Sequence, residues 1–166
     1  GNISIALDEA KVVKDTQTNT WTAVAERVTA NRYEGISPGV ELPKDPRIHN
    51  TGDNAAYVRL KISVPGSVMN YYNNGFLELI NNTLHANWVY TDTKEEHGNR
   101  VYTVTYQKVL EAGVSTEAAF THVMIPASIT NQQAAAINSF NIHIVAEAIQ
   151  ADGFHNVTDA FTAFDN

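Results

Sequence analysis

The sequence predicts an all-β protein, an antiparallel β-sandwich with one or two short helices. Three observations predict this fold: several short runs alternate apolar and polar residues, turn-forming residues separate these runs, and helical spacing is confined to short stretches. The chain has 166 residues, of which 43% are hydrophobic and 17% are charged, so it can build a core and lacks the composition of a disordered protein. We therefore expect residues 1–166 to form a single β-sandwich domain.

Alternation along the chain predicts the first strands. Residues 1–7 (GNISIAL) have the pattern of a strand, and residues 56–64 (AYVRLKISV) form the clearest one. In this second run, one face carries Val58, Leu60, Ile62 and Val64. The strand should end at Pro65, because proline cannot donate a hydrogen bond to the ladder.

A hairpin and two further strands follow. Residues 84–91 and 101–108 alternate again, and the polar residues 92–100 between them predict a longish loop. Further strands are predicted at residues 118–125 and 140–149. In the last strand, the apolar face consists of Phe140, Ile142, Ile144, Ala146 and Ala148.

Helical signals are few. Residues 128–137 predict a short helix before the last strand, and residues 156–164 predict a C-terminal helix. Asn156 is the candidate N-cap of this second helix, because its side chain can accept a hydrogen bond from a free backbone N–H of the first turn. Residues 76–81 (FLELIN) fit either a helix or a strand.

Charge and composition disfavour several classes of protein. With 11 basic and 18 acidic residues the net charge is −7, whereas binders of nucleic acid or anionic lipid are usually basic. The absence of cysteine excludes disulfides, thiolate metal sites and a cysteine nucleophile. No apolar run approaches the ~20 residues of a membrane span. Because the chain opens on a strand-like run, we expect a longer precursor whose signal peptide and first residues after cleavage are absent here.

Motifs for catalysis or metal binding are missing from the sequence. It contains neither the H-E-x-x-H pattern nor the G-x-S-x-G pattern, so we expect no catalytic, cofactor-binding or metal-binding residues and no cofactor. We expect Glu95, Glu96 and His97 at a solvated loop tip, and His122 and His143 on solvent faces of strands. The six histidines have no four-residue spacing: His49, His85, His97, His122, His143 and His155.

Two turns and a set of aromatic residues are expected to be structural. Residues 50–54 (NTGDN) are rich in side-chain oxygens but lack the carboxylates of a calcium loop, so we expect an Asx-type turn with Gly52 at positive φ. Pro38 and Gly39 predict a type II turn. A set of aromatic residues could line a groove that binds carbohydrate or peptide. Alternatively, these residues belong to the core and form cross-strand pairs, and this is the interpretation that we favour. The set is Tyr71, Tyr72, Phe76, Trp88, Tyr90, Tyr102 and Tyr106.

One stretch resembles a known family. A proline-glycine turn is followed by a basic residue, Asp-Pro, an apolar residue and Asn-Thr-Gly-Asp before a Tyr-Val strand. The matching residues are Pro38, Gly39, Lys44, Asp45, Pro46, Ile48, Asn50, Thr51, Gly52, Asp53, Tyr57 and Val58. Residues 44–65 thereby resemble the TasA/camelysin-like proteins, which Gram-positive bacteria export with a SipW-type signal peptidase. Residues 1–7 and 148–154 are similar to that family's first strand and C-terminal ending.

The resemblance implies a jelly-roll-like form of the sandwich and an extracellular location at the cell surface or in a biofilm matrix. It also implies a structural protein that acts by self-association into fibres or by attachment. The expected partners are other copies of the chain, through strand exchange, or other matrix proteins. The motif residues of the turns are expected to be structural.

Two other functions stay open at this stage. Camelysin-type members have been classed as metalloendopeptidases, which would require a zinc site with three protein ligands and an open position. A carbohydrate- or peptide-binding sandwich would require a concave aromatic groove.

Overall fold

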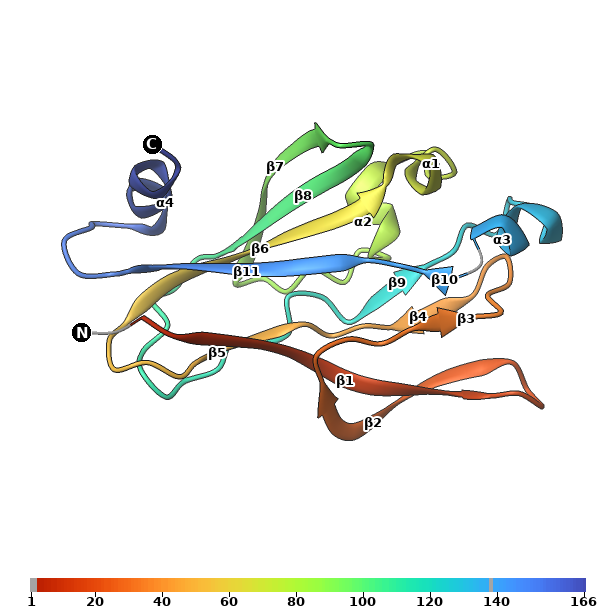
Figure 1. The fold of residues 1–166 in the computed structure, drawn as a ribbon, viewed down its shortest axis with the longest axis horizontal. Helices are drawn as coiled ribbons and strands as arrows, with labels where there is room; N and C mark the ends of the chain where they lie inside the picture. Colours follow the sequence, from red (N-terminus) through yellow and green to blue (C-terminus); the bar gives the residue numbers. More distant parts are fainter. Residues whose placement is uncertain (1–2, 138) are drawn as a thin grey trace.

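Two antiparallel sheets form the body of the computed structural model, which describes residues 3–137 and 139–166. They lie on either side of the hydrophobic core, so the predicted all-β sandwich is confirmed (Figure 1). The first sheet has the order β2-β1-β5 and contains β1 (Ile5–Asp15), β2 (Thr20–Val28) and β5 (Arg47–Asn50). The second has the order β11-β6-β8-β7 and contains β6 (Ala56–Pro65), β7 (Trp88–Glu96), β8 (Asn99–Tyr106) and β11 (His143–Gln150).

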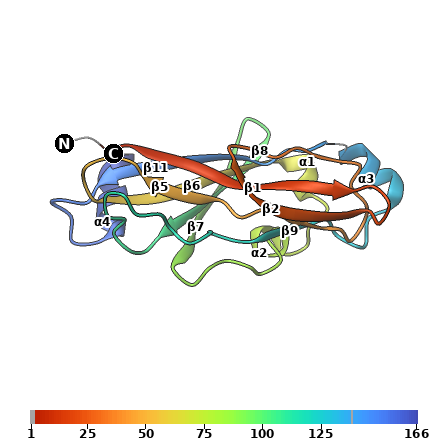
Figure 2. The same cartoon turned by 90° about the horizontal axis from the view of Figure 1, so that it is seen from below.

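Two short sheets, β10-β3 and β4-β9, extend the sandwich at the end opposite α4 (Figure 1). Seen from below, the β1–β2 hairpin lies in front and runs along the long axis of the molecule (Figure 2). The short strands are β3 (Tyr33–Glu34), β4 (Glu41–Pro43), β9 (His122–Met124) and β10 (Ser139–Phe140).

The described residues contain four short helices, more than the one or two predicted. Two of them lie where helical spacing predicted them, and Asn156 is the N-cap of the last, accepting a hydrogen bond from Asp159 N–H at 2.8 Å. The ambiguous residues 76–81 belong mostly to a helix. The helices are α1 (Gly66–Met69), α2 (Gly75–Leu79), α3 (Asn131–Ile137) and α4 (Val157–Asp165).

Strand β6 is the centre of the core. Its alternation is confirmed, and the strand ends at Pro65 as predicted. The second face of β6 is also covered: Tyr57 and Arg59 are each only 6% exposed, because α4 packs over them. The residues of the core face are at most 1% exposed: Val58, Leu60, Ile62 and Val64.

The β7–β8 hairpin differs from the predicted one. Its strands pair as far as Glu96 and Asn99, so only His97 and Gly98 form the turn, with φ of 53° and 79°. The long loop predicted at residues 92–100 is therefore wrong. Positive φ at both positions matches the two-residue turns that suit the twist of antiparallel strands. The prediction failed because β7 is exposed along its length beyond Trp88, so polar residues continue the strand.

Other predicted strands are shorter than expected. The run at residues 84–91 starts only at Trp88, and the run at residues 118–125 is reduced to β9. The run at residues 140–149 is interrupted at residues 141–142 and divided into β10 and β11. Its apolar face does point to the core. The first strand begins at Ile5, and Gly1 and Asn2 of the predicted strand lie outside the described residues.

The two predicted turns have different outcomes. Gly39 has a φ of 76° and Val40 N–H donates to Ser37 O at 3.2 Å, as in a type II turn. Gly52, in contrast, does not have a positive φ, so that prediction is wrong. The Asx-type turn itself is present, because Gly52 N–H donates to Asn50 Oδ1 at 3.0 Å. The asparagine side chain closes this turn without a left-handed residue.

Replacing Gly98 by alanine should destabilise the protein by about 1–2 kcal/mol, the usual cost of left-handed backbone for a residue with a Cβ. An added Cβ would meet no atom within 4 Å, so the cost is purely conformational. Urea unfolding followed by circular dichroism measures it. The control is Gly52→Ala, expected within about 0.5 kcal/mol of the parent protein. Equal stability of the two variants would contradict the assigned turns.

Candidate functional site

The residues of the predicted turn motif fall into two groups. Pro38 and Gly39 form the turn between β3 and β4, where Gly39 N–H donates to Ile125 O at 3.0 Å. The second group lies between β4 and β6, on the first sheet's side of the molecule (Figure 1). It consists of Asp45, Pro46, Asn50, Thr51, Gly52 and Asp53.

Asn50 of the second group is a structural residue. It is 2% exposed, and its Nδ2 donates to Asn54 O at 2.8 Å and to Leu110 O at 2.9 Å. Its backbone oxygen accepts a further hydrogen bond from Gly113 N–H. Asn50 therefore ties the loop before β6 to the segment after β8.

Asp45 belongs to an ionic cluster with Asp8, Arg27 and His49. The Arg27 guanidinium donates to Asp45 Oδ2 at 2.9 Å and to Asp8 Oδ1 at 2.7 Å. Asp45 Oδ1 also accepts a hydrogen bond from Ala10 N–H at 2.7 Å. Burial alone raises the pKa of Asp8, but contacts with His49 and Arg27 outweigh it and hold the pKa below its ordinary value. Asp8 is therefore an anion at neutral pH.

A relay of three polar side chains continues from this cluster to the surface. His49 Nε2 lies 2.8 Å from Asp8 Oδ2, and His49 Nδ1 is hydrogen-bonded to Ser115 Oγ. Ser115 is exposed, and it faces His49 across an isolated β-bridge. Serine, histidine and carboxylate in this order are the groups of nucleophilic catalysis. Sequence reasoning missed them, because Ser115 and His49 are 66 positions apart.

Beneath the cluster lies a buried triad of Glu9, Asn31 and Lys44. Glu9 is 5% exposed and Lys44 is 3% exposed. Lys44 Nζ lies 2.8 Å from Glu9 Oε1 and 3.0 Å from Oε2, and Asn31 Nδ2 lies 2.7 Å from the same Oε2. The Glu9 carboxylate therefore binds both an amine and a carboxamide; Glu9 and Lys44 are buried, and Asn31 is half-buried.

Tyr33 forms one wall of the buried triad. Its ring centroid lies 5.8 Å from Lys44 Nζ, and its hydroxyl donates to Pro43 O at 2.6 Å. Burial, together with the nearby negative charge of Glu9, raises the pKa of Tyr33 far above its ordinary value. The phenol of Tyr33 is therefore neutral.

The described part of the chain contains no group of three or more His, Asp or Glu side chains arranged to hold a metal ion. His97 is exposed in the β7–β8 turn and His143 is exposed on β11, as predicted. His122 on β9 is half-buried, with Nδ1 3.5 Å from Glu41 Oε1.

The aromatic set lies mainly in the core, as favoured by the sequence. Trp88 and Tyr106 are direct partners in the β7–β8 ladder, with ring centroids 5.1 Å apart. Phe76 of α2 packs on Tyr102 at 5.0 Å and on Tyr90 at 5.1 Å. Tyr90, at 37% exposure, stands at the margin. These residues stabilise the sheet through cross-strand and helix contacts.

Helix α4 is held on the second sheet by an apolar cluster and by ion pairs of Arg59. Arg59 of β6 forms a two-pronged ion pair with Asp165, at 3.0 and 2.6 Å, and donates to Glu147 of β11 at 2.8 Å. Its guanidinium also lies 4.3 Å from the ring centroid of Phe161. A cleft of about 240 Å³ remains beneath the helix. Five of the residues that line the cleft are threonines: Thr91, Thr103, Thr105, Thr158 and Thr162.

Strands at the ends of the two large sheets differ in how they are protected against the addition of a further strand. Strand β7 carries the charged residues Asp92, Lys94, Glu95 and Glu96 and a register shift, which are features that hinder the addition of a further strand. Strand β11 pairs with β6 without any register shift and contains neither proline nor glycine. Its one acidic residue, Glu147, is bound by Arg59. Strand β11 is therefore the regular, unprotected edge of the second sheet.

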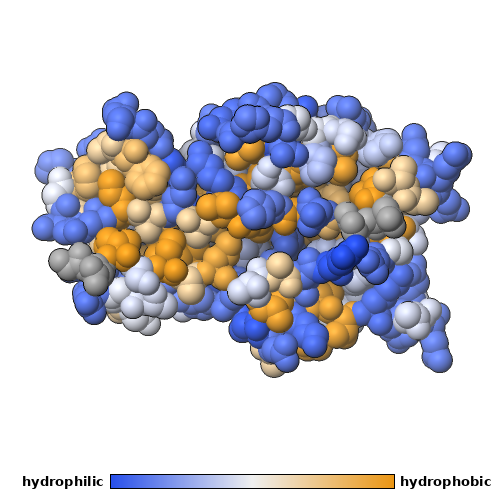
Figure 3. Space-filling view, viewed as in Figure 1, coloured by the Kyte–Doolittle hydropathy of each residue, from blue (hydrophilic) through white to orange (hydrophobic). Residues whose placement is uncertain are grey.

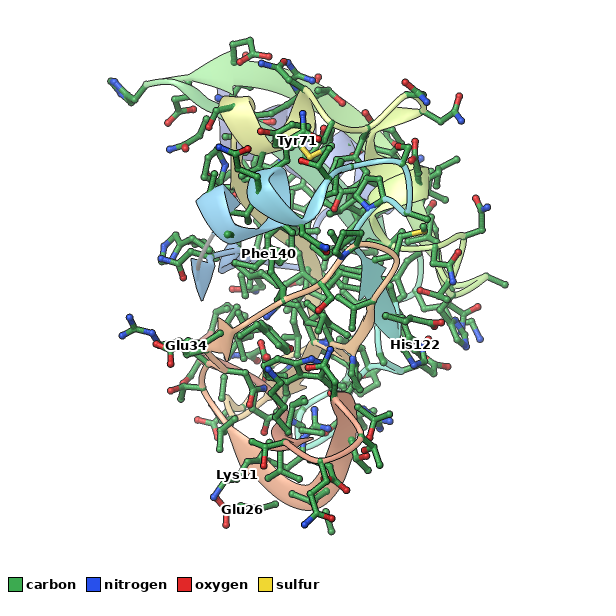
Figure 4. All side chains as sticks on the ribbon, turned by 90° about the vertical axis from the view of Figure 1, so that its right-hand side faces the viewer. Lys11, Glu26, Glu34, Tyr71, His122 and Phe140 are labelled. Carbon is green, nitrogen blue, oxygen red and sulfur yellow. The ribbon has the colours of Figure 1, made fainter. Side chains whose placement is uncertain are left out.

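Strand β2, at one end of the first sheet, is intermediate between β7 and β11 in its protection against an added strand. Residues 20–25 (TWTAVA) carry no charge, and Val24 is 38% exposed. Beyond them, Glu26 points toward Lys11 of β1, at 3.9 Å, and the β1–β2 ladder is irregular there (Figure 4). The regular part of this edge is thus short and uncharged.

Fold and edges together define an all-β sandwich in which α4 covers one sheet and β11 presents a regular free edge. Comparisons with protein-family models, with curated proteins and with solved structures find no match. Among the described residues, no helix combines the length and the apolar character needed to cross a membrane.

Acid should release α4 from the second sheet. The hydrogen bond from Arg59 lowers the pKa of Asp165 below its ordinary value of 3.8. The stabilisation is therefore complete above that ordinary value and is lost as the pH falls through the lowered one. Hydrogen exchange of the α4 amides should accelerate over this range relative to their intrinsic rate at each pH. Asp165→Asn should accelerate it already at neutral pH, whereas the control Asp152→Asn, at an exposed site before α4, should behave as the parent. Unchanged exchange in Asp165→Asn would contradict the anchoring role.

Proposed function

We propose that the protein is an extracellular structural protein of the cell surface or biofilm matrix that acts by self-association into fibres. The observation that carries this proposal is the free edge of β11, which is regular and lacks the charges that protect β7. Such an edge accepts an added strand through backbone hydrogen bonds. The resemblance of residues 44–65 to the TasA/camelysin-like proteins agrees with this role and with an extracellular location.

The surroundings of β11 favour an added strand. Strand β1 lies beside β11, but within the described residues no ladder joins the two (Figure 1). Apolar atoms gather on this face around β11 and the start of β1 (Figure 3). The inward-facing residues there are only half-buried: Ile5, Leu7, Ile144, Ala146 and Ala148. A further strand at this edge would cover them, which supports binding through apolar burial as well as hydrogen bonds.

Strand β2 of a second copy is the partner that we propose for β11. It belongs to the hairpin that extends from the body of the molecule, and its residues 20–25 carry no charge (Figure 1). Val24 of β2 and Val145 of β11 are 38% and 45% exposed, so each strand has an accessible apolar residue in its middle. Because donor and acceptor are different strands, the contact does not close on itself and generates a linear array.

The net charge of the protein opposes this association. Each copy carries a net charge of −7, so copies repel each other at low ionic strength. Salt shortens the range of that repulsion to about 10 Å at 0.1 M. Assembly should therefore increase with both protein and salt concentration.

The experiment measures molar mass by light scattering across both concentrations. The parent protein should form multimers, whereas Val24→Lys and Val145→Lys should each be monomeric, because a charge on either strand opposes pairing. An equimolar mixture of the two variants should form dimers and nothing larger, since each variant retains one intact strand.

The matched control is Val114→Lys, an exposed loop valine that should leave assembly unchanged. Dimerisation of Val145→Lys alone would instead indicate pairing of β2 with β2. A parent protein that is monomeric at every concentration of protein and salt would overturn the proposal.

A second candidate function, hydrolysis of an ester or amide, is favoured by the relay of Asp8, His49 and Ser115. In such a reaction His49 would take the proton of Ser115 Oγ, with the Asp8 carboxylate 2.8 Å from His49 Nε2 but not hydrogen-bonded to it. The contact of Arg27 with Asp8 at 2.7 Å weakens this role, because it offsets the carboxylate charge. For this reason we rank hydrolysis second.

Hydrolysis of p-nitrophenyl acetate tests this second candidate. If the relay is catalytic, Ser115→Ala and His49→Gln should each lower the rate by more than tenfold, since general base catalysis contributes about 10²–10⁴-fold. Ser128→Ala, a serine outside the relay, is the control and should retain the parent rate. Equal rates in all four proteins would exclude the relay from catalysis.

A further inference from the structure

The buried triad has the groups for a chemical reaction that the proposed self-association does not require. Lysine is rarely buried to the extent of Lys44, which is 3% exposed, because its ammonium loses hydration there. Its partner Glu9 is buried to 5% exposure, and both nitrogens of the triad share Glu9 Oε2. A reaction at Lys44 requires its ammonium to give up a proton, and the Glu9 carboxylate, with Oε1 2.8 Å from Lys44 Nζ, is in contact to accept it. The neutral amine of Lys44 is a nucleophile.

The electrophile is the carboxamide carbon Cγ of Asn31. Its Oδ1 accepts a hydrogen bond from Val12 N–H at 2.8 Å, and this donor would stabilise negative charge developing on the oxygen. Its Nδ2 donates to Ala10 O and to Glu9 Oε2, each at 2.7 Å. The carboxylate that removes a proton from Lys44 is thus also in contact with the nitrogen that would leave.

We propose that Lys44 and Asn31 become joined by an isopeptide bond that Glu9 promotes, so that the mature protein carries a covalent cross-link between the segment after β2 and the segment after β4. No other molecule takes part, since the Lys44 amine and the Asn31 carboxamide are both hydrogen-bonded to the Glu9 carboxylate inside one chain. The bond would make the junction of these segments permanent.

The atoms of this reaction balance without an oxidant or reductant. Lys44 Nζ forms a bond to Asn31 Cγ, and the bond from Cγ to Nδ2 breaks. Of the three protons of the ammonium, one stays on the new amide nitrogen. The other two reach Nδ2 by way of Glu9, and the nitrogen leaves as an ammonium ion.

The intact mass of the folded protein tests the proposal. Measured under denaturing conditions, it should be lower than the mass of the sequence by about 17 Da, one molecule of ammonia. Trypsin cleaves after Arg27, Arg32 and Arg47. Peptides 28–32 and 33–47 should therefore remain linked after cleavage at Arg32, and fragmentation should place the branch on Asn31 and Lys44.

Three variants and one control test which residues the cross-linking reaction requires. Glu9→Gln, Asn31→Ala and Lys44→Arg should each have the full mass of their sequences, folded or not. The control Lys11→Arg replaces an exposed lysine of β1 and should keep the loss of ammonia. A parent protein with the full sequence mass would overturn the proposal and leave the triad an ion pair. Loss of ammonia in Glu9→Gln would overturn the role of Glu9.

Discussion

The buried contact of Glu9 with Lys44 is the constraint on which the rest of the first sheet depends. Removing two charges from water costs several kcal/mol per ion unless each is paired and hydrogen-bonded. Glu9 lies on β1, Lys44 follows β4 and Asn31 follows β2, so three segments must meet correctly before that cost is offset. The ionic cluster extends the same junction, because Arg27 of β2 holds both Asp8 of β1 and Asp45.

In the second sheet both faces are covered, whereas one edge is exposed. One of its faces packs on the core, and the other is covered by α4, which Arg59 holds through Asp165. Its edge at β11 stays free and is bordered by half-buried apolar residues. A body whose faces are closed and whose edge is open suits a subunit that binds its neighbours through strands.

Local patterns predicted much of the fold and little of the candidate site. The alternation of residues 56–64 identified β6, and Asn156 identified the start of α4, because both signals depend on neighbouring residues. The polar residues of β7 misled the prediction, since an exposed edge strand needs no apolar face. The turn motif indicated Asp45 and Lys44 but not their partners. Glu9 and Asn31 have no local pattern that marks them as contacts of Lys44.

The sequence by itself determined the all-β class, the type II turn at Pro38 and Gly39, the cap of α4 and the net charge of −7. Each of these depends on backbone preference or composition within a few residues. Only the tertiary structure decided that Arg59 meets Asp165 from 106 positions away, and that Lys44 meets Glu9 from 35. The physical reason is that strand register and the packing of the sheets place these side chains, and burial then makes their pairing obligatory.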